Sequence, residues 1–150
     1  MGGIVDNPTY GQICTGNTGH AEAVQVTFQP AKVSLEEILE IFFKMHDPTT
    51  KNRQGADVGT QYRSVIFYSN DDQRETAVKS IEAAQPKFKN PIVTEVTSAT
   101  TWYKAEKSHQ DYYARNKSSN SYCRYVIHPK LQKVKHSKFK GTGLMSAMMG

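Results

Sequence analysis

Residues 34–48 constrain the fold most, because they specify an amphipathic helix with both of its ends marked. Ser34, followed three residues later by Glu37, forms a capping-box pattern. Apolar side chains then recur at helical spacing, and His46-Asp47-Pro48 is a typical stop. A helix with one apolar face has to pack against a second layer. The face consists of Leu35, Ile38, Leu39, Phe42 and Met45.

Three segments around this helix have the pattern of strands. Residues 23–28 (AVQVTF) and 92–96 alternate apolar and polar side chains, and residues 62–68 (YRSVIFY) are typical of a largely buried strand. Asn70 caps a second expected helix over 71–85. This order predicts an α+β fold, a two-layer α/β sandwich with a small mixed sheet. The apolar face of the second helix would be Ala77, Val78, Ile81 and Ala84.

The remaining segments are expected to be less regular. Residues 1–22 have the composition of a loop, and residues 49–61 (TTKNRQGADVGTQ) form a polar stretch of a length that often carries function. A short helix is expected over 106–115, with irregular chain from residue 117 onward. We therefore expect one α/β domain over 1–127 and a basic C-terminal tail over 128–150.

Composition excludes several classes of protein. The chain has 150 residues, enough for one domain with its own core, and no run approaches the roughly 20 apolar residues of a membrane span. Its first residues lack the basic and apolar regions of a secretory signal. We therefore expect a cytoplasmic protein without membrane contact. The two cysteines, Cys14 and Cys123, make neither a disulfide scaffold nor a paired metal motif.

Charge is spread unevenly along the chain. The net charge is +5, the last acidic residue is Asp111, and eight Lys and Arg residues follow it. A basic tail can contact nucleic acid. Aromatic residues that would stack on bases are sparse there, with only Phe139 in the last stretch, so a solvated tail is favoured.

Several polar side chains are candidates for chemistry. Glu22 stands at the entrance to an expected strand, where a carboxyl beside an apolar site can become a proton donor. A solvated or salt-bridged glutamate is the alternative. Tyr10 and Tyr62 are hydroxyl donors or core residues, and Asp57, in the long loop, is a site residue or a turn former.

The thiols also allow two readings. Cys14 is a nucleophile by type, but its loop offers no helix N-terminus to activate it, and a small buried thiol is favoured. Cys123 lies in the C-terminal region, where it could reach a distant site or be an incidental thiol. Neither His46 nor His109 has the spacing of a metal site.

Five phrases in order resemble one protein family. They are NPTY at 7–10, CTGNTGHAEAV at 14–24, HDPTT at 46–50, NRQGADVGTQYRS at 52–64 and AEKSHQDYY at 105–113. Together they are similar to the A type of peptide methionine sulfoxide reductase, over residues 7–125. The resemblance implies an α+β sandwich with a mixed sheet related to the ferredoxin-like arrangement.

The resemblance also implies an activity. It is the reduction of peptide-bound and free L-methionine-S-sulfoxide in the repair of oxidised proteins. Glu22 would be the acid, Tyr10 and Tyr62 would donate hydroxyls to the sulfoxide oxygen, and Asp57 would hold the network or orient a water. Cys123 would be a recycling thiol. No cofactor is implied. Thioredoxin or dithiothreitol would be the reductant, and the protein would be a monomer.

One motif of that family is not in this sequence. The family nucleophile lies in GCFWG, ahead of NPTY, and no GCFWG occurs here. Cys14 corresponds to a family position that is not the nucleophile. We expect an N-terminally shortened member, because Tyr10, Glu22, Asp57 and Tyr62 are all retained. The alternative is a non-catalytic binding module for methionine sulfoxide peptides.

Overall fold

Two helices and two strands make the main body of the protein. The computed structural model describes residues 1–135, with side chains described as far as Gln132. Helix α2 (Leu35–Met45) begins with the expected capping box between Ser34 and Glu37, and α3 (Asp71–Ala84) begins where Asn70 accepts the N–H of Gln73. Strands β3 (Val65–Tyr68) and β4 (Glu95–Ser98) pair in parallel, with Val65 opposite Glu95. The α+β class is confirmed.

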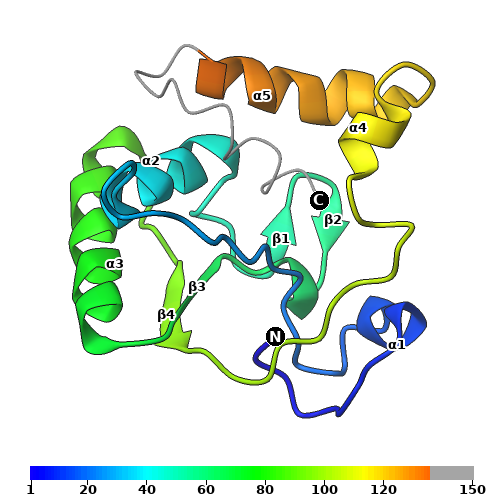
Figure 1. The fold of residues 1–150 in the computed structure, drawn as a ribbon, viewed down its shortest axis with the longest axis horizontal. Helices are drawn as coiled ribbons and strands as arrows, with labels where there is room; N and C mark the ends of the chain where they lie inside the picture. Colours follow the sequence, from blue (N-terminus) through cyan, green and yellow to red (C-terminus); the bar gives the residue numbers. More distant parts are fainter. Residues whose placement is uncertain (136–150) are drawn as a thin grey trace.

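The main core lies where α2 and α3 meet this sheet (Figure 1). Leu39 and Phe43 of α2 are buried against Ala77 and Ala84 of α3. Partly buried side chains from both strands, Ile66 and Val96 among them, complete the cluster. Val78 does not belong to it, because 43% of its surface is exposed, so its predicted place on the buried face was wrong.

Helix α2 is buried on two sides rather than one. Ile38 and Ile41 form a second cluster with Val33, and Val26 and Phe28 pack against it. The expected single stripe therefore missed Ile41 and Phe43, which are 3% and 5% exposed. A helix enclosed between two packed segments buries more than one face.

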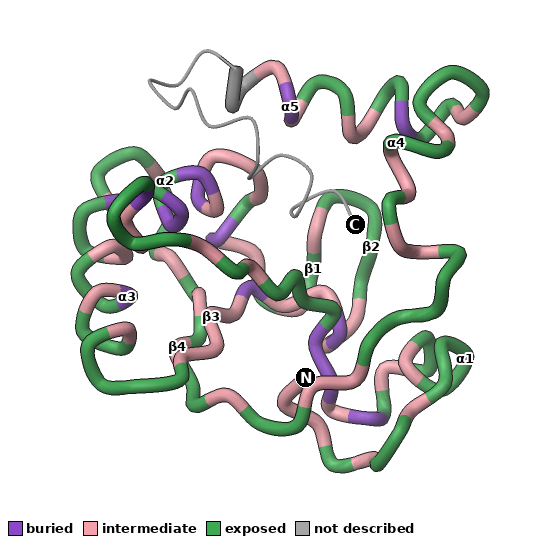
Figure 2. Tube along the Cα trace, viewed as in Figure 1, coloured by how far each residue is buried: buried purple, intermediate pink, exposed green. Residues whose placement is uncertain are grey.

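The strand expected over 23–28 is absent. Residues 20–29 have no regular structure, and none of the residues described forms a ladder with them. Alternation describes a half-buried surface, but a strand also needs a hydrogen-bonded partner. Figure 2 shows most of this segment as exposed, with Val26 and Phe28 partly buried.

The polar stretch at 49–61 is more ordered than expected. Strands β1 (Arg53–Gln54) and β2 (Asp57–Val58) form an antiparallel hairpin, and the 3₁₀ helix η1 (Thr60–Tyr62) follows. Because η1 takes residues 60–62, β3 begins three residues later than predicted. The third predicted strand, at 92–96, is likewise shifted, to β4. A second 3₁₀ turn, η2 (Gln85–Lys87), ends α3.

The C-terminal region is helical where irregular chain was expected. Helix α4 (Tyr112–Asn116) is shorter than the helix predicted over 106–115. The π-helix η3 (Cys123–Ile127) runs into α5 (His128–Lys135), which packs against α2 and buries Leu131 to 4% exposure. Isolated Leu and Val residues gave too weak a period to predict this helix. The rest of the expected basic tail, 136–150, lies outside the described residues.

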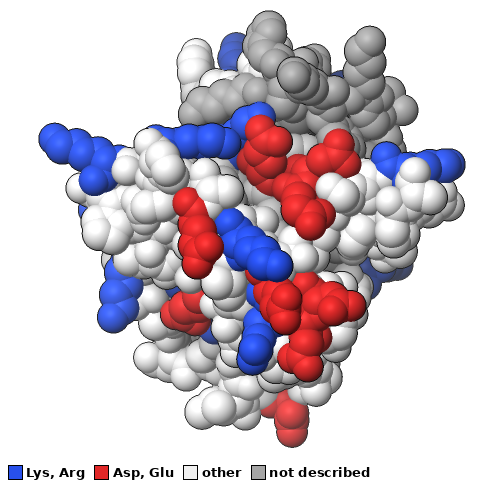
Figure 3. Space-filling model, turned by 90° about the vertical axis from the view of Figure 1, so that its left-hand side faces the viewer, with Lys and Arg blue, Asp and Glu red and all other residues white. Residues whose placement is uncertain are grey.

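The surface seen from the α3 side carries both signs of charge. Figure 3 shows Lys and Arg interspersed with Asp and Glu on this face. Ion pairs one helical turn apart join Lys44 to Glu40 at 2.7 Å and Lys79 to Glu75 at 3.8 Å. Among residues 1–135, no helix has the length and apolar character needed to cross a membrane.

Candidate active site

The short helix α1 (Tyr10–Cys14) presents the first two candidate side chains. Thr9 caps it, and Gln12 completes a capping box. Tyr10 and Cys14 are one turn apart, and both are exposed. A hydrogen bond with the Cys14 side chain is the main cause that raises the pKa of Tyr10, and nearby Glu22 and Tyr62 add to it.

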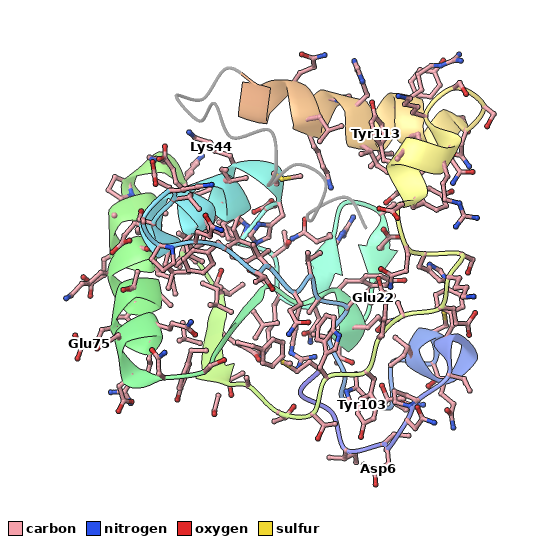
Figure 4. The ribbon with its side chains drawn as sticks, in the orientation of Figure 1. Asp6, Glu22, Lys44, Glu75, Tyr103 and Tyr113 are labelled. Atoms are coloured by element: carbon pink, nitrogen blue, oxygen red, sulfur yellow. The ribbon has the colours of Figure 1, made fainter. Side chains whose placement is uncertain are left out.

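Glu22 is held beside η1 by its own backbone. Its N–H donates to the carbonyl of Gln61 at 2.9 Å, and the Thr60 hydroxyl donates to the carbonyl of Gly16 at 2.7 Å. The loop that carries the acid is therefore joined to the turn that carries Tyr62, and Figure 4 shows Glu22 next to that turn.

The electrostatic setting of Glu22 favours its protonated form. The residue keeps contact with solvent, yet the surrounding protein removes enough hydration to raise the pKa of its carboxyl. His109 opposes this shift, and the negative charge of Asp57 adds to it. A carboxyl in this state can donate a proton nearer to neutral pH than an ordinary glutamate.

Asp57 and Tyr62 reach the same place from the hairpin. Asp57 is on β2, and Tyr62 ends η1. Burial raises the pKa of Tyr62, and the charges of Glu22 and Asp57 raise it further. The Gln61 side chain acts in the opposite direction through a hydrogen bond. Glu22 thus lies within electrostatic reach of the other three predicted residues, Tyr10, Asp57 and Tyr62.

Two further residues belong to this group, and sequence reasoning missed both as site residues. The pKa of Tyr122 is raised by burial and then by Asp57 and Glu22, so this tyrosine lies near the same two carboxylates. The ring of His109 lies 4.4 Å from that of Tyr10, between centroids. Two features of the sequence could have pointed to them. Tyr122 stands directly before Cys123, and His109 belongs to the AEKSHQDYY phrase.

Cys123 stands apart from the exposed side chains. It follows Tyr122 directly, but its side chain is fully buried in η3. The exposed thiol is Cys14, for which a buried position was expected, so that expectation was wrong. Within residues 1–135 no three His, Cys, Asp or Glu side chains are arranged to hold a metal ion.

In this α+β domain one carboxyl and three tyrosine hydroxyls lie around one loop cluster, and groups of these types can give a proton or a hydrogen bond to an oxygen atom. The family model for peptide methionine sulfoxide reductase matches residues 1–142. The chain is 51% identical to peptide methionine sulfoxide reductase MsrA 1 of Rhodopirellula baltica, over 95% of this chain and 76% of that protein. It is 52% identical to MsrA of Saccharolobus solfataricus, over 88% of this chain and 74% of that protein.

Solved structures agree with the sequence relatives. Reduced Mxr1 from Saccharomyces cerevisiae superposes with a TM-score of 0.72 at 40% identity, covering 75% of this chain and 62% of that one. Methionine sulfoxide reductase A of Corynebacterium diphtheriae superposes with a TM-score of 0.73 at 37% identity, covering 79% of this chain and 62% of that one. The chain therefore spans about three quarters of those curated relatives and less than two thirds of the solved chains. The protein belongs to the peptide methionine sulfoxide reductase family.

Proposed function

We propose that this protein binds L-methionine-S-sulfoxide, in oxidised peptides and proteins or free, and acts in its reduction to methionine. The observation that carries the proposal is the Glu22 carboxyl, whose pKa is raised by desolvation and which lies near enough to Tyr10 and Tyr62 for its charge to raise theirs. A sulfoxide oxygen leaves sulfur only as it is protonated, so such a site supplies what the reaction needs.

Each predicted side chain has a part in this proposal. Glu22 gives a proton to the sulfoxide oxygen, while Tyr10 and Tyr62 donate hydrogen bonds to it. Asp57 keeps the proton on Glu22 through its negative charge. Tyr122 is a third hydroxyl at the same site.

The atoms balance through thiol chemistry. The attacking thiolate comes from the external dithiol reductant: it attacks the sulfoxide sulfur, Glu22 protonates the oxygen, the S–O bond breaks, and the oxygen ends on the attacking thiol as a sulfenic acid while methionine is released. A second thiol then attacks the sulfenic sulfur, which forms a disulfide and releases water. We assign Cys123 to this recycling step and a dithiol such as thioredoxin to the final reduction. Because Cys123 is fully buried, the step requires local opening of η3.

The test compares binding with turnover. The full chain is titrated with peptides carrying the S or the R sulfoxide, and turnover is followed with dithiothreitol. Glu22→Gln is compared with Glu36→Gln, a control in the exposed first turn of α2. Loss of a general acid should lower turnover by about 10²–10⁴-fold, and the control should not change it.

Three outcomes separate the readings. S-selective binding with turnover that fails in Glu22→Gln supports the proposal. S-selective binding without turnover supports the binding-module alternative. If neither epimer binds and no methionine is formed, the proposal is wrong.

A further inference from the structure

His20 is a buried histidine with both ring nitrogens committed to the backbone. The residue is 2% exposed. The N–H of Gly3 donates to Nδ1 at 3.0 Å, and Nε2 lies 2.8 Å from the carbonyl oxygen of Val5. Since Nδ1 accepts, the hydrogen of the neutral ring is on Nε2 and is donated to Val5. The ring therefore has no nitrogen left for a substrate or a proton transfer.

These two bonds fasten the first residues of the chain to the loop at 18–21. Beside them, the Ile4 N–H donates to the Thr18 carbonyl at 3.0 Å, and the Ala21 N–H donates to the Met1 carbonyl at 2.9 Å. The approach is close at Gly3, where an added Cβ would overlap Thr18 O and His20 N. Residues 1–5 and 18–21 thus form one packed unit.

Tyr103 covers this unit from outside. Its ring meets the His20 ring edge-on, with centroids 5.5 Å apart at 82°. Its hydroxyl donates to Asp6 at 2.9 Å (Figure 4). The segment before α1 is therefore fixed at two successive residues, at Val5 by the His20 ring and at Asp6 by the Tyr103 hydroxyl.

The unit lies between the acid and one of its hydroxyl donors. Glu22 follows His20 by two residues, and Tyr10 follows Val5 by five. The Glu22 N–H, bonded to Gln61, adds Tyr62 to the same frame. The groups that shift the Glu22 pKa, other than burial, are His109 and Asp57, so His20 does not act on the carboxyl through its own charge.

We propose that His20 is a positioning residue, which sets the placement of the Glu22 carboxyl relative to the Tyr10 hydroxyl through its paired bonds to Gly3 and Val5. This inference rests on the proposed function for its consequence in catalysis. His20, the histidine of TGHAE, would thus orient the site without contacting the substrate or transferring a proton.

The experiment measures the Glu22 carboxyl pKa by NMR titration of the full chain, with no ligand present. His20→Leu removes both bonds. His20→Asn keeps an acceptor for Gly3, and His20→Gln keeps a donor for Val5. His46→Leu is the matched control, because His46 also has both ring nitrogens bonded, to Phe42 and Ser64, and is not among the groups that shift Glu22.

In His20→Leu the loop loosens, Glu22 regains water, and its pKa falls toward the ordinary carboxyl range. His46→Leu lowers the melting temperature and leaves the Glu22 pKa in place. His20→Asn and His20→Gln, which each keep one of the two bonds, give a Glu22 pKa between those of the wild type and His20→Leu. In a parallel titration, His20→Leu weakens binding of an S-sulfoxide peptide about tenfold, the equivalent of about one lost hydrogen bond.

An unchanged Glu22 pKa in His20→Leu would overturn the proposal. If that variant does not fold, an unchanged pKa in both Asn and Gln variants overturns it equally. Failure of the wild-type chain to bind any sulfoxide contradicts only the proposed function, because the pKa comparison needs no ligand.

Discussion

Replacing Gly59 by alanine tests how tightly the turn beneath the site is packed. Gly59 has φ 152° and ψ 160°, a region that side-chain-bearing residues rarely adopt. A Cβ there would overlap Gln61 Oε1 and lie 2.8 Å from its Cδ. Gln61 is 4% exposed, so it has little room to move. Its carbonyl is the acceptor that holds Glu22.

The expected destabilisation has two parts. The backbone strain contributes about 1–3 kcal/mol, and overpacking against a buried side chain contributes about 1–3 kcal/mol. We take about 3 kcal/mol as the total, which for a chain of this size lowers the melting temperature by about 6–12 °C. Displacing Gln61 also shifts Glu22, so S-sulfoxide binding weakens together with stability.

The control is Gly55→Ala, in the turn of the adjoining hairpin between β1 and β2. Gly55 has φ 59°, and an added Cβ would meet nothing within 4 Å. Only backbone strain of about 1–2 kcal/mol applies there. Urea and thermal unfolding of both variants give the difference. If Gly59→Ala is no less stable than Gly55→Ala, Gln61 is not packed as described, and the link from η1 to Glu22 loses its basis.

Three further predictions concern titration and thiol access. Glu22 has a raised pKa in the folded state, so stability falls as pH rises above the ordinary carboxyl pKa of about 4.3. Glu22→Gln should therefore exceed the wild type in free energy of unfolding at pH 7 and lose that advantage at pH 4; an equal difference at both pH values would contradict this. Burial lowers the pKa of His46, so its contribution to stability falls as pH drops below about 6.5. In urea unfolding below this pH, the free energy of unfolding of His46→Gln should therefore change less with pH than that of the wild type. A thiol reagent should label Cys14 quickly in the native protein and Cys123 only slowly, at the rate at which η3 opens locally; labelling of native Cys123 as fast as that of Cys14 would refute its burial.

The two main helices were predictable because their signals are local. Ser34 and Asn70 satisfy N–H groups within three residues of themselves, so their caps are specified by short sequence. The strand at 23–28 failed for the opposite reason. Its alternation is real, and Val26 and Phe28 do pack on a core, but pairing depends on a neighbour that no local pattern encodes.

The site divides in a similar way. Glu22, Tyr10, Asp57 and Tyr62 were predicted through a resemblance that is a property of the sequence. Tyr122 and His109 were missed as site residues, because the turn ahead of α4 and the residue ahead of η3 bring them to the site from the C-terminal region. The exposure of Cys14 also reversed the sequence-based expectation of a buried thiol.

The sequence by itself determined the family, the two capped helices and the types of side chain available for proton donation. Only the tertiary structure decided which tyrosines lie near Glu22, which thiol is buried, and that His20 is bonded to Gly3 and Val5. The physical reason is the sequence separation over which each interaction acts. Caps and periodicity act over a few residues, whereas hydration, charge and backbone pairing at the site depend on residues up to about a hundred positions apart that meet only in the folded chain.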